Sequence, residues 1–233
     1  MLTLFFKPDH WALAESHWQF ETLDQGIRVE TRKETGSDIR AFRVQLSVEA
    51  PVTAVLAMLD DPSRYPEWIQ GCTESRLIEQ KNFRQRLIYQ VNDMPWPVTD
   101  RDLVLDVRVE EKIHGHFMLH LNNQPDAYPV RDKIRVNRAS GYYLVRPNHQ
   151  GGTHITWEQH TEPGGELPGW LVNQLLVDIP LQSMKNLREQ LARSKGLYQQ
   201  AELLRDHAGE VLGWSADWKR LRHGDNEEFG RYR

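Results

Sequence analysis

The stretch PGWLVNQLLVDIPLQSMKNLREQLARSK, residues 168–195, decides the fold of this 233-residue chain. Proline suits the first turn of a helix, and the basic residues near position 195 lie where the negative end of the helix dipole favours them. Between Trp170 and Leu181 the predicted helix is apolar on most of its circumference. A helix of this kind must be covered on most sides. The rest of the chain therefore has to supply a cover for it.

Most of the sequence before this helix predicts β-strands, because apolar and polar residues alternate with the period of half-buried strands. Residues 18–48 predict three consecutive antiparallel strands, and Pro51 opens a short predicted helix that ends before Pro62. Further strands are predicted at 74–80, 84–91, 98–111, 115–122, 131–146 and 152–161. Short turns between neighbours predict one large antiparallel sheet. The fold class is therefore α+β, with one large antiparallel sheet and a C-terminal helix that packs against it.

Composition limits the classes of function. Lys+Arg 29 against Asp+Glu 33 gives a net charge of -4, which argues against a chain built to wrap nucleic acid. The single cysteine, Cys72, forms no intrachain disulfide and has no evident base nearby to make it a nucleophile. No apolar run approaches the roughly 18 residues of a membrane span, and residues 1–6 are too short for a signal-peptide core. We expect a soluble, cytoplasmic protein.

Motifs for catalysis and for cofactor binding are absent from the sequence. It contains no Gly-x-Ser-x-Gly elbow, phosphate-binding glycine loop, dinucleotide fingerprint or His-Glu-x-x-His pair. His114, His116 and His120 share one face of a predicted strand, where solvent exposure explains them more simply than a metal. The same expectation applies to His154 and His160. We therefore expect no catalytic residue, no metal site and no cofactor.

Arg101 is the most informative single position. On its predicted strand it shares a face with Leu103, Leu105 and Val107, and so points toward an apolar interior. A buried guanidinium is costly unless something pairs with it. Either Arg101 binds the polar end of a ligand or a buried carboxylate, with Asp132 or Glu158 as the candidate, or it caps the strand at the rim and reaches water.

Several ordered motifs carry a resemblance to a known family. They are GIRV at 26–29, YPEW at 65–68, MPWP at 94–97, Arg101-Asp102, GYYLVRP at 141–147, THITW at 153–157 and PGGELPGWLVN at 163–173. The set resembles the START (StAR-related lipid-transfer) domain family of the helix-grip superfamily, over roughly residues 18–191. The resemblance implies a long antiparallel sheet curled around a C-terminal helix, with a hydrophobic tunnel for one lipid or similar molecule.

The resemblance also implies roles for particular segments. The lid would comprise residues 168–181 and 92–98, and each segment carries a tryptophan, Trp170 and Trp96. These tryptophans would contact a membrane interface during exchange, or would pack against each other as core. The buried arginine of the family corresponds to Arg101. The preceding strand, 87–91, offers no acidic partner, which departs from some members.

We expect residues 1–196 to form a START-like lipid-binding domain and residues 197–233 a C-terminal helical extension. The function expected is non-enzymatic binding, and intermembrane transfer or sensing, of a lipid or other hydrophobic small molecule, with transient contact to a membrane surface and none to nucleic acid. Arg101, Tyr89 or Asp132 would orient its polar end. The residues expected to contact it are Arg101, Tyr89, Leu103, Leu105, Val107, Phe117, Asp132, Ile134, Val136, Trp96, Trp170, Asn173 and Val177.

Two functions of other classes remain open. The helix-grip superfamily also contains aromatases and cyclases that act on polyketides, so an enzyme that uses the same cavity is one alternative. The other is a ligand-gated regulatory module that binds a partner through the segment with Trp214 and Trp218.

Overall fold

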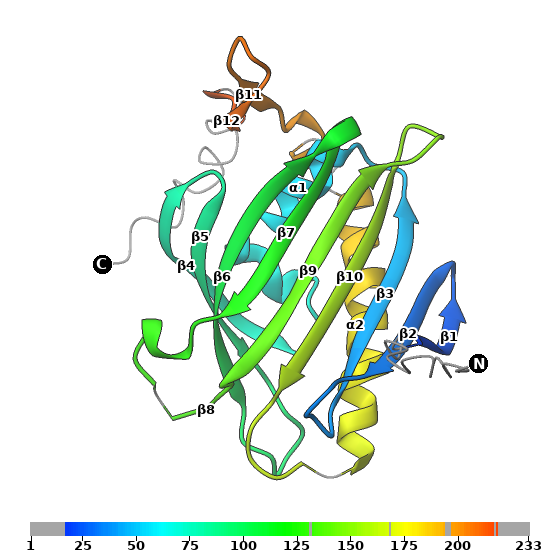
Figure 1. Ribbon diagram of the computed structural model, residues 1–233, viewed down its shortest axis with the longest axis vertical. Coiled ribbons are helices and arrows are strands. Elements are labelled where there is room, and N and C mark those ends of the chain that lie inside the picture. The colour runs from blue at the N-terminus through cyan, green and yellow to red at the C-terminus, as the bar shows by residue number, and fades with distance from the viewer. Residues whose placement is uncertain (1–16, 131, 168, 194–196, 217, 219–233) are drawn as a thin grey trace, which may run out of the picture.

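The computed structural model describes residues 17–130, 132–167, 169–193, 197–216 and 218. Its main feature is a ten-stranded sheet in the order β1-β2-β3-β10-β9-β7-β6-β5-β4, with β8 paired to β6. All pairs are antiparallel except β6 with β8 (Figure 1). The strands are β1 Gln19–Asp24, β2 Ile27–Lys33, β3 Arg40–Val48, β4 Cys72–Asn82, β5 Gln85–Asn92, β6 Arg101–Lys112, β7 His116–Asn123, β8 Ile134–Arg135, β9 Arg138–Pro147 and β10 Thr153–Glu162.

These strands confirm the alternation in the sequence, with one difference. The segment expected as a single strand at 131–146 is divided into β8 and β9. Arg135, at the end of β8, turns its guanidinium to the buried carboxylate of Asp102, with Nε–Oδ1 at 2.8 Å. A buried ion pair between neighbouring strands holds this short strand beside β6.

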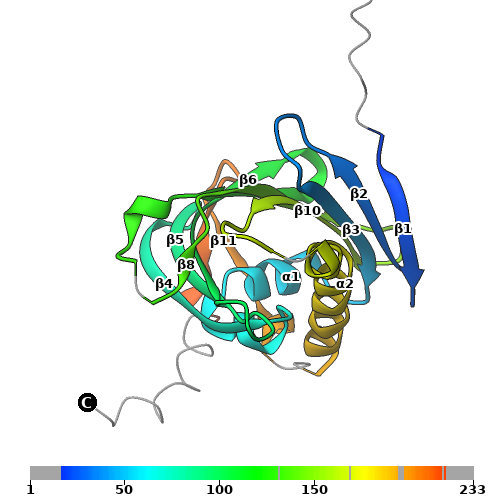
Figure 2. The same cartoon turned by 90° about the horizontal axis from the view of Figure 1, so that it is seen from below.

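Two helices lie on the concave side of the sheet. Helix α2, Gly169–Arg193, runs for 25 residues, and Figure 2 shows the sheet curving around it and around α1, Val52–Leu59. A 3₁₀ segment, η1 Pro62–Glu67, follows α1. Helix α2 packs against β2 and β3 and buries Leu171, Leu176, Met184, Leu187 and Leu191. The sheet thus covers one side of the helix. The expected cover on most sides is only partly met, because Val172, Leu175, Val177, Ile179 and Leu181 are partly rather than fully buried.

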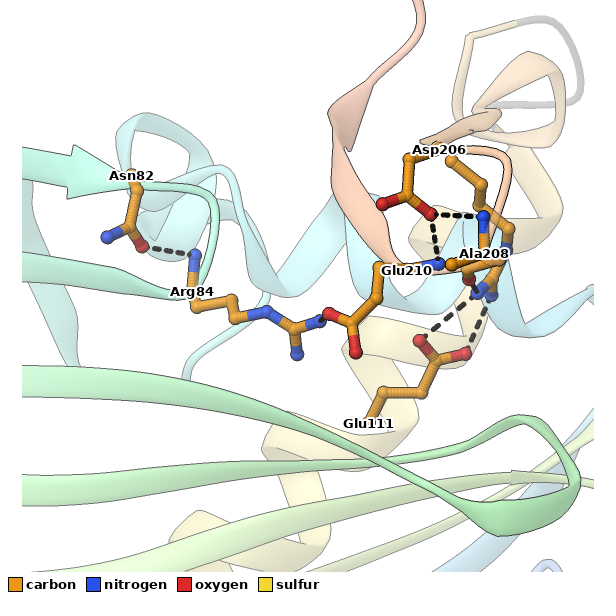
Figure 3. A network of polar contacts seen from close by, with 8 residues as sticks. Asn82, Arg84, Glu111, Asp206, Ala208 and Glu210 are labelled. Atoms are coloured by element: carbon orange, nitrogen blue, oxygen red, sulfur yellow. Dashed lines mark hydrogen bonds and ion pairs between the residues drawn. The ribbon is translucent and has the colours of Figure 1, made fainter.

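The expected helical extension is wrong for the described part of residues 197–233. A 3₁₀ turn, η4 Tyr198–Gln200, leads into an antiparallel hairpin of β11, Leu203–Arg205, and β12, Val211–Trp214. The Asp206 Oδ1 accepts hydrogen bonds from the backbone N–H groups of Ala208 and Glu210, both at 2.9 Å, which closes the turn (Figure 3). Such side-chain bonds to the following backbone favour a turn over a helix. Residues 219–233 lie outside the described residues.

The hairpin packs on the main domain. Arg205 forms two bonds with Glu111 at the end of β6, and Arg84 pairs with Glu210 at 3.1 Å (Figure 3). Beneath these surface contacts, the Trp214 Nε1 donates to the Asp60 Oδ2 at 2.6 Å. Asp60 in turn pairs with the buried Arg86 at 2.8 Å. The extension therefore closes the end of the fold where α1 ends.

Candidate ligand-binding cavity

An internal cavity lies between the concave face of the sheet, the N-terminal half of α2 and the segment that follows α1. The space inside it that the centre of a water molecule can reach is about 140 Å³. One buried water needs roughly 10–15 Å³ by this measure, so the cavity is much larger than a site for structural water. The lining residues are Ile39, Phe42, Tyr65, Ile69, Gln70, Gly71, Ile88, Gln90, Asn92, Asp93, Met94, Arg101, Leu103, Leu105, Val107, Leu121, Val136, Tyr143, Trp157, Gln159, Thr161, Pro163, Leu167, Val172, Leu175, Leu176 and Ile179.

The period of the strands produces the apolar wall. On β6, Leu103, Leu105 and Val107 occupy alternate positions and all line the cavity. Side chains two residues apart on a strand point to the same face, so this run builds a continuous wall. Leu176 and Ile179 of α2 line the cavity from the opposite side. The greater part of the lining is aliphatic or aromatic, which suits the apolar part of a ligand.

Neutral polar side chains lie on two of the walls. On β5 the Gln90 amide donates to the Asn92 Oδ1 at 2.7 Å. On β10 the Gln159 Nε2 donates to the Thr161 Oγ1 at 2.8 Å, and the Trp157 Nε1 donates to the Gln159 Oε1 at 3.1 Å. Asn92 is opposite Arg101 in the register of β5 and β6. These groups place amide and hydroxyl functions in the same cavity as the guanidinium.

Arg101 is the cation among the described residues that line the cavity, with 1% of its surface exposed. Its guanidinium donates to three backbone carbonyls: from Nη1 to Thr99, from Nη2 to Gly164 at 2.9 Å, and from Nε to Pro163 at 3.4 Å. Among the described residues, no carboxylate lies within ion-pair distance of it. Burial lowers the pKa of Arg101, and the charge of Asp100 offsets this only in part. Of the five guanidinium N–H groups, about two remain for another partner.

The two carboxylates expected as partners of Arg101 lie elsewhere. Asp132 is exposed at the surface. Glu158 pairs with Arg32 at 3.1 Å and accepts a hydrogen bond from Tyr142 at 2.9 Å. Its neighbours on β10, Trp157 and Gln159, line the cavity, so the alternation of the strand turns Glu158 to the convex face. Neither Asp132 nor Glu158 is therefore the partner of Arg101. The expectation that Arg101 reaches water at the rim is also wrong, because the side chain is buried.

Five of the residues that we expected to contact a ligand line the cavity: Arg101, Leu103, Leu105, Val107 and Val136. Others lie outside it. Tyr89 is buried on the convex face, where it packs against Tyr128 at 5.0 Å, because its neighbours Ile88 and Gln90 point inward. Phe117 is buried in the core but pairs with Glu111 at the far end of β6, beyond the cavity.

The remaining predicted contacts are on the edge of the site or outside the described side chains. Ile134 packs near Gly164 and Gly165, beside the cavity. Val177 of α2 is partly buried against the core. Trp96 is 92% exposed in the loop between β5 and β6. Because Trp96 is in solvent, it is not core. The side chains of Trp170 and Asn173 lie outside the described residues.

The sequence contained signals for some lining residues that we did not predict. Trp157, Gln159 and Thr161 follow the alternation of Thr153–Glu162, so the period-2 rule that placed Leu103 inside would also have placed them. Tyr65, Ile69 and Gln70 come from the irregular segment after α1. No periodicity assigns a face to such a segment.

The titratable side chains outside the cavity do not form an evident reactive centre. Burial raises the pKa of Cys72 to about 12, so its thiol is protonated at neutral pH. His160 was expected to be exposed, but only 7% of it is, because its Nε2 lies 3.2 Å from the Ser37 Oγ and 3.4 Å from Glu162. Within the described residues, no group of three or more His, Cys, Asp and Glu side chains is arranged to hold a metal ion. Nor is any described helix long and apolar enough to cross a membrane.

Solved structures share this architecture. A StAR-related lipid transfer protein from Xanthomonas axonopodis, a fragment, is 31% identical, with a TM-score of 0.70, and the match covers 75% of this chain and 98% of that one. Human STARD10 superposes with a TM-score of 0.68 over 90% of this chain and 82% of its own, at 18% identity, which shows the fold alone.

Comparison by sequence finds relatives of the same kind as comparison by structure. An uncharacterized protein of Pseudomonas aeruginosa is 36% identical over 76% of this chain and 87% of its own length. Human phosphatidylcholine transfer protein is 25% identical over 70% of this chain and 78% of its own. The family model described as START domain matches residues 9–195. The chain therefore belongs to the START domain family.

Proposed function

We propose that this protein binds one amphiphilic lipid in its internal cavity, without covalent chemistry, and carries it between membranes. The observation that carries the proposal is Arg101, a buried cation that faces an apolar cavity without a carboxylate partner among the described residues. An unpaired buried charge is costly for stability, so its presence is better explained by a ligand than by the fold.

The lining supports a division of the ligand into two parts. Leu103, Leu105 and Val107 would exclude water from the acyl or ring portion. Arg101, with the amides of Gln90 and Asn92, would bind the oxygen atoms of the head group. A mostly apolar pocket with a few polar groups that fix the orientation is the usual design of such sites.

The titratable groups of the lining favour binding over catalysis. Asp93 is the carboxylate among the described lining residues, and these contain no histidine and no glutamate. Burial raises the pKa of Tyr65 to about 12 and that of Tyr143 well above its usual value, so neither phenol serves as a base near pH 7. A cyclase-type mechanism would need a general acid and a general base at the ligand.

The transfer step would use the loop that joins β5 and β6. Asn92, Asp93 and Met94 at the start of this loop line the cavity, and Trp96 further along it is 92% exposed. Tryptophan is enriched at membrane interfaces, where its ring lies at the level of the head groups. Contact of Trp96 with a bilayer would place the cavity next to its lipid source. The relative named phosphatidylcholine transfer protein supports this proposal.

Native mass spectrometry of the purified protein, followed by solvent extraction, tests the proposal. We expect a stoichiometric lipid adduct on the wild type and none on Leu105→Trp, because the larger ring fills the cavity. Glu110→Trp is the matched control: it lies on the same strand at an exposed position and should retain the adduct. Circular dichroism checks that all three proteins are folded. Absence of any adduct from the wild type, together with no uptake from a panel of lipid vesicles, would overturn the proposal.

A further inference from the structure

One side wall of the cavity is only a single layer of side chains thick. Ile39, Pro163, Leu167 and Val172 line the cavity, and the same four residues line a depression on the outer surface. The depression lies between the turn that joins β2 to β3 and the loop from Pro163 to Leu167. Movement of this loop alone would therefore connect the cavity with solvent.

The loop 163–167 is tied to the domain from the inside, by Arg101. The carbonyl oxygens of Gly164 and Pro163 accept from its guanidinium, at 2.9 Å and 3.4 Å. Among the described residues, Pro163 and Gly164 form no other hydrogen bond. The residue that faces the cavity as its cation is thus also the residue that holds the loop closed.

The backbone of the loop requires glycine at two positions. Ile134 is the residue that packs against both. Gly164 and Gly165 have φ values of +71° and +64°, a region that L-residues with side chains rarely adopt. Side-chain atoms of Ile134 lie 3.4 Å from where a Cβ would stand on either glycine. On the opposite side of the depression, Ser37 is held by His160 at 3.2 Å. The loop, rather than the β2–β3 turn, is the side that a change at Arg101 would release.

We propose that the loop 163–167 closes a second opening of the cavity, and that a ligand with a carboxylate head opens it by binding Arg101. This inference rests on the proposed function. A carboxylate forms shorter and stronger hydrogen bonds with a guanidinium than a backbone carbonyl does, and its two oxygens match the fork of the side chain. Bound side-on to Nε and Nη2, such a head group would compete with Pro163 and Gly164 for the N–H groups that they now accept from. The ligand would then bind Arg101, and the loop would lose the two hydrogen bonds that hold it to the guanidinium.

Coupling of this kind is reciprocal. If a carboxylate ligand binds the state with the loop open, then a change that loosens the loop without altering Arg101 must raise the affinity for carboxylate ligands. A neutral ligand of the same shape gains little from Arg101, so its affinity should not follow the state of the loop. The opening would thus select ligands by the charge of the head group.

Hydrogen exchange of the full-length protein with a matched pair of ligands, oleic acid and oleyl alcohol, tests the inference. With oleic acid bound, we expect amide exchange at residues 164–167 to rise at least threefold over the apo protein. With oleyl alcohol bound, it should stay unchanged or fall. Peptides that cover β6 provide the internal control and should be protected to the same degree by both ligands. In Arg101→Met the difference between the two ligands at residues 164–167 should vanish.

A second variant tests the reciprocal effect away from the cation. Ile134→Ala removes packing from Gly164 and Gly165, and should strengthen the binding of oleic acid at least threefold relative to oleyl alcohol. Exposed Val130→Ala in the same region is its control and should change neither affinity. If both ligands bind and change the exchange of the loop equally, the second opening is overturned while the proposed function stands. If neither ligand binds although the purified protein carries a lipid adduct, this inference is overturned while the proposed function stands. If there is also no adduct and no uptake from the lipid panel, both fail.

Discussion

Three of the arginines that the structure describes are buried, and they satisfy their charges in two different ways. Arg135 pairs with Asp102, of which 0% is exposed, and Arg86 pairs with Asp60. Arg101 instead donates to backbone carbonyls at the edge of the cavity. Buried ion pairs that lose one partner leave a costly unpaired charge. Arg86 and Arg135 are therefore parts of the architecture, whereas Arg101 has hydrogen-bonding capacity left for a ligand.

At the residue scale, we predict that Arg86→Met destabilises the protein far more than Arg84→Met. The first change leaves the buried carboxylate of Asp60 without its cation, at a cost of about 3–5 kcal/mol in the free energy of unfolding. Arg84 pairs with Glu210 at the surface, where 37% and 69% of the two side chains are exposed, and such pairs contribute roughly 0–1 kcal/mol. Urea unfolding of both variants measures the difference. Equal costs would show that Arg86 and Asp60 do not act as a buried pair.

At the scale of elements, the segment after α2 is part of the domain rather than an appendage. Tyr198, Trp214 and Trp218 are buried in the same core as the sheet and α1. The Tyr198 hydroxyl lies 3.1 Å from the Asp61 Oδ2, next to the pair that Trp214 makes with Asp60. Phe83, in the turn between β4 and β5, meets the Trp214 ring edge-on at 5.6 Å. These contacts seal the end of the fold that is opposite the thin wall of the cavity.

Removal of residues 197–233 should therefore lower the melting temperature of the protein. Burial of one large apolar side chain contributes about 1.5–3 kcal/mol, so loss of three aromatic side chains should cost at least about 4.5 kcal/mol. For a chain of this size that corresponds to a fall of roughly 9–18 °C or more, measured by differential scanning calorimetry. Trp214→Phe keeps an aromatic ring, although a smaller one, and loses the bond to Asp60, so it should show part of this fall. An unchanged melting temperature for the truncated chain would contradict the assignment of the extension to the core.

At the scale of the whole molecule, the cavity results from uneven filling of the curved sheet. Helix α1, the C-terminal half of α2 and the extension fill one end of the concave face, where Met184, Leu187 and Trp218 are almost fully buried. The N-terminal half of α2 lies over the other end and leaves the cavity between itself and β6. A ligand there would replace missing contacts between the sheet and the helix.

Ligand removal should therefore destabilise the protein, and replacement should restore it. A ligand at about 100 times its Kd adds roughly 2.7 kcal/mol to the free energy of unfolding, which is a rise of about 5–11 °C in Tm. We expect delipidated wild type to show this rise when oleic acid is returned, as measured by scanning calorimetry. Leu105→Trp should melt at one temperature with or without oleic acid. A rise of the same size in Leu105→Trp would place the ligand outside the cavity.

Much of this fold was predictable because its signals are local. The alternation in Arg101–Lys112 assigns Leu103, Leu105 and Val107 to one face, and the structure places all three in the cavity. The apolar residues of 170–181 predicted a helix, which the structure confirms, with Leu171 and Leu176 buried on one side of it. Both patterns follow from the geometry of a single strand or helix, so they hold before any tertiary contact forms.

What the tertiary structure alone decided are the contacts between distant segments. The hydrogen-bond partners of Arg101 include carbonyls more than 60 residues away, and carbonyls carry no side-chain signal in a sequence. The hairpin at 203–214 has strands of three and four residues, too short for a period to identify, and tertiary packing around Trp214 stabilises it. His160 is buried because Ser37 comes from another turn to cover it. Sequence alone thus determined which faces are apolar, because periodicity is local. Folding decided what each face meets, because those contacts join residues that no local pattern connects.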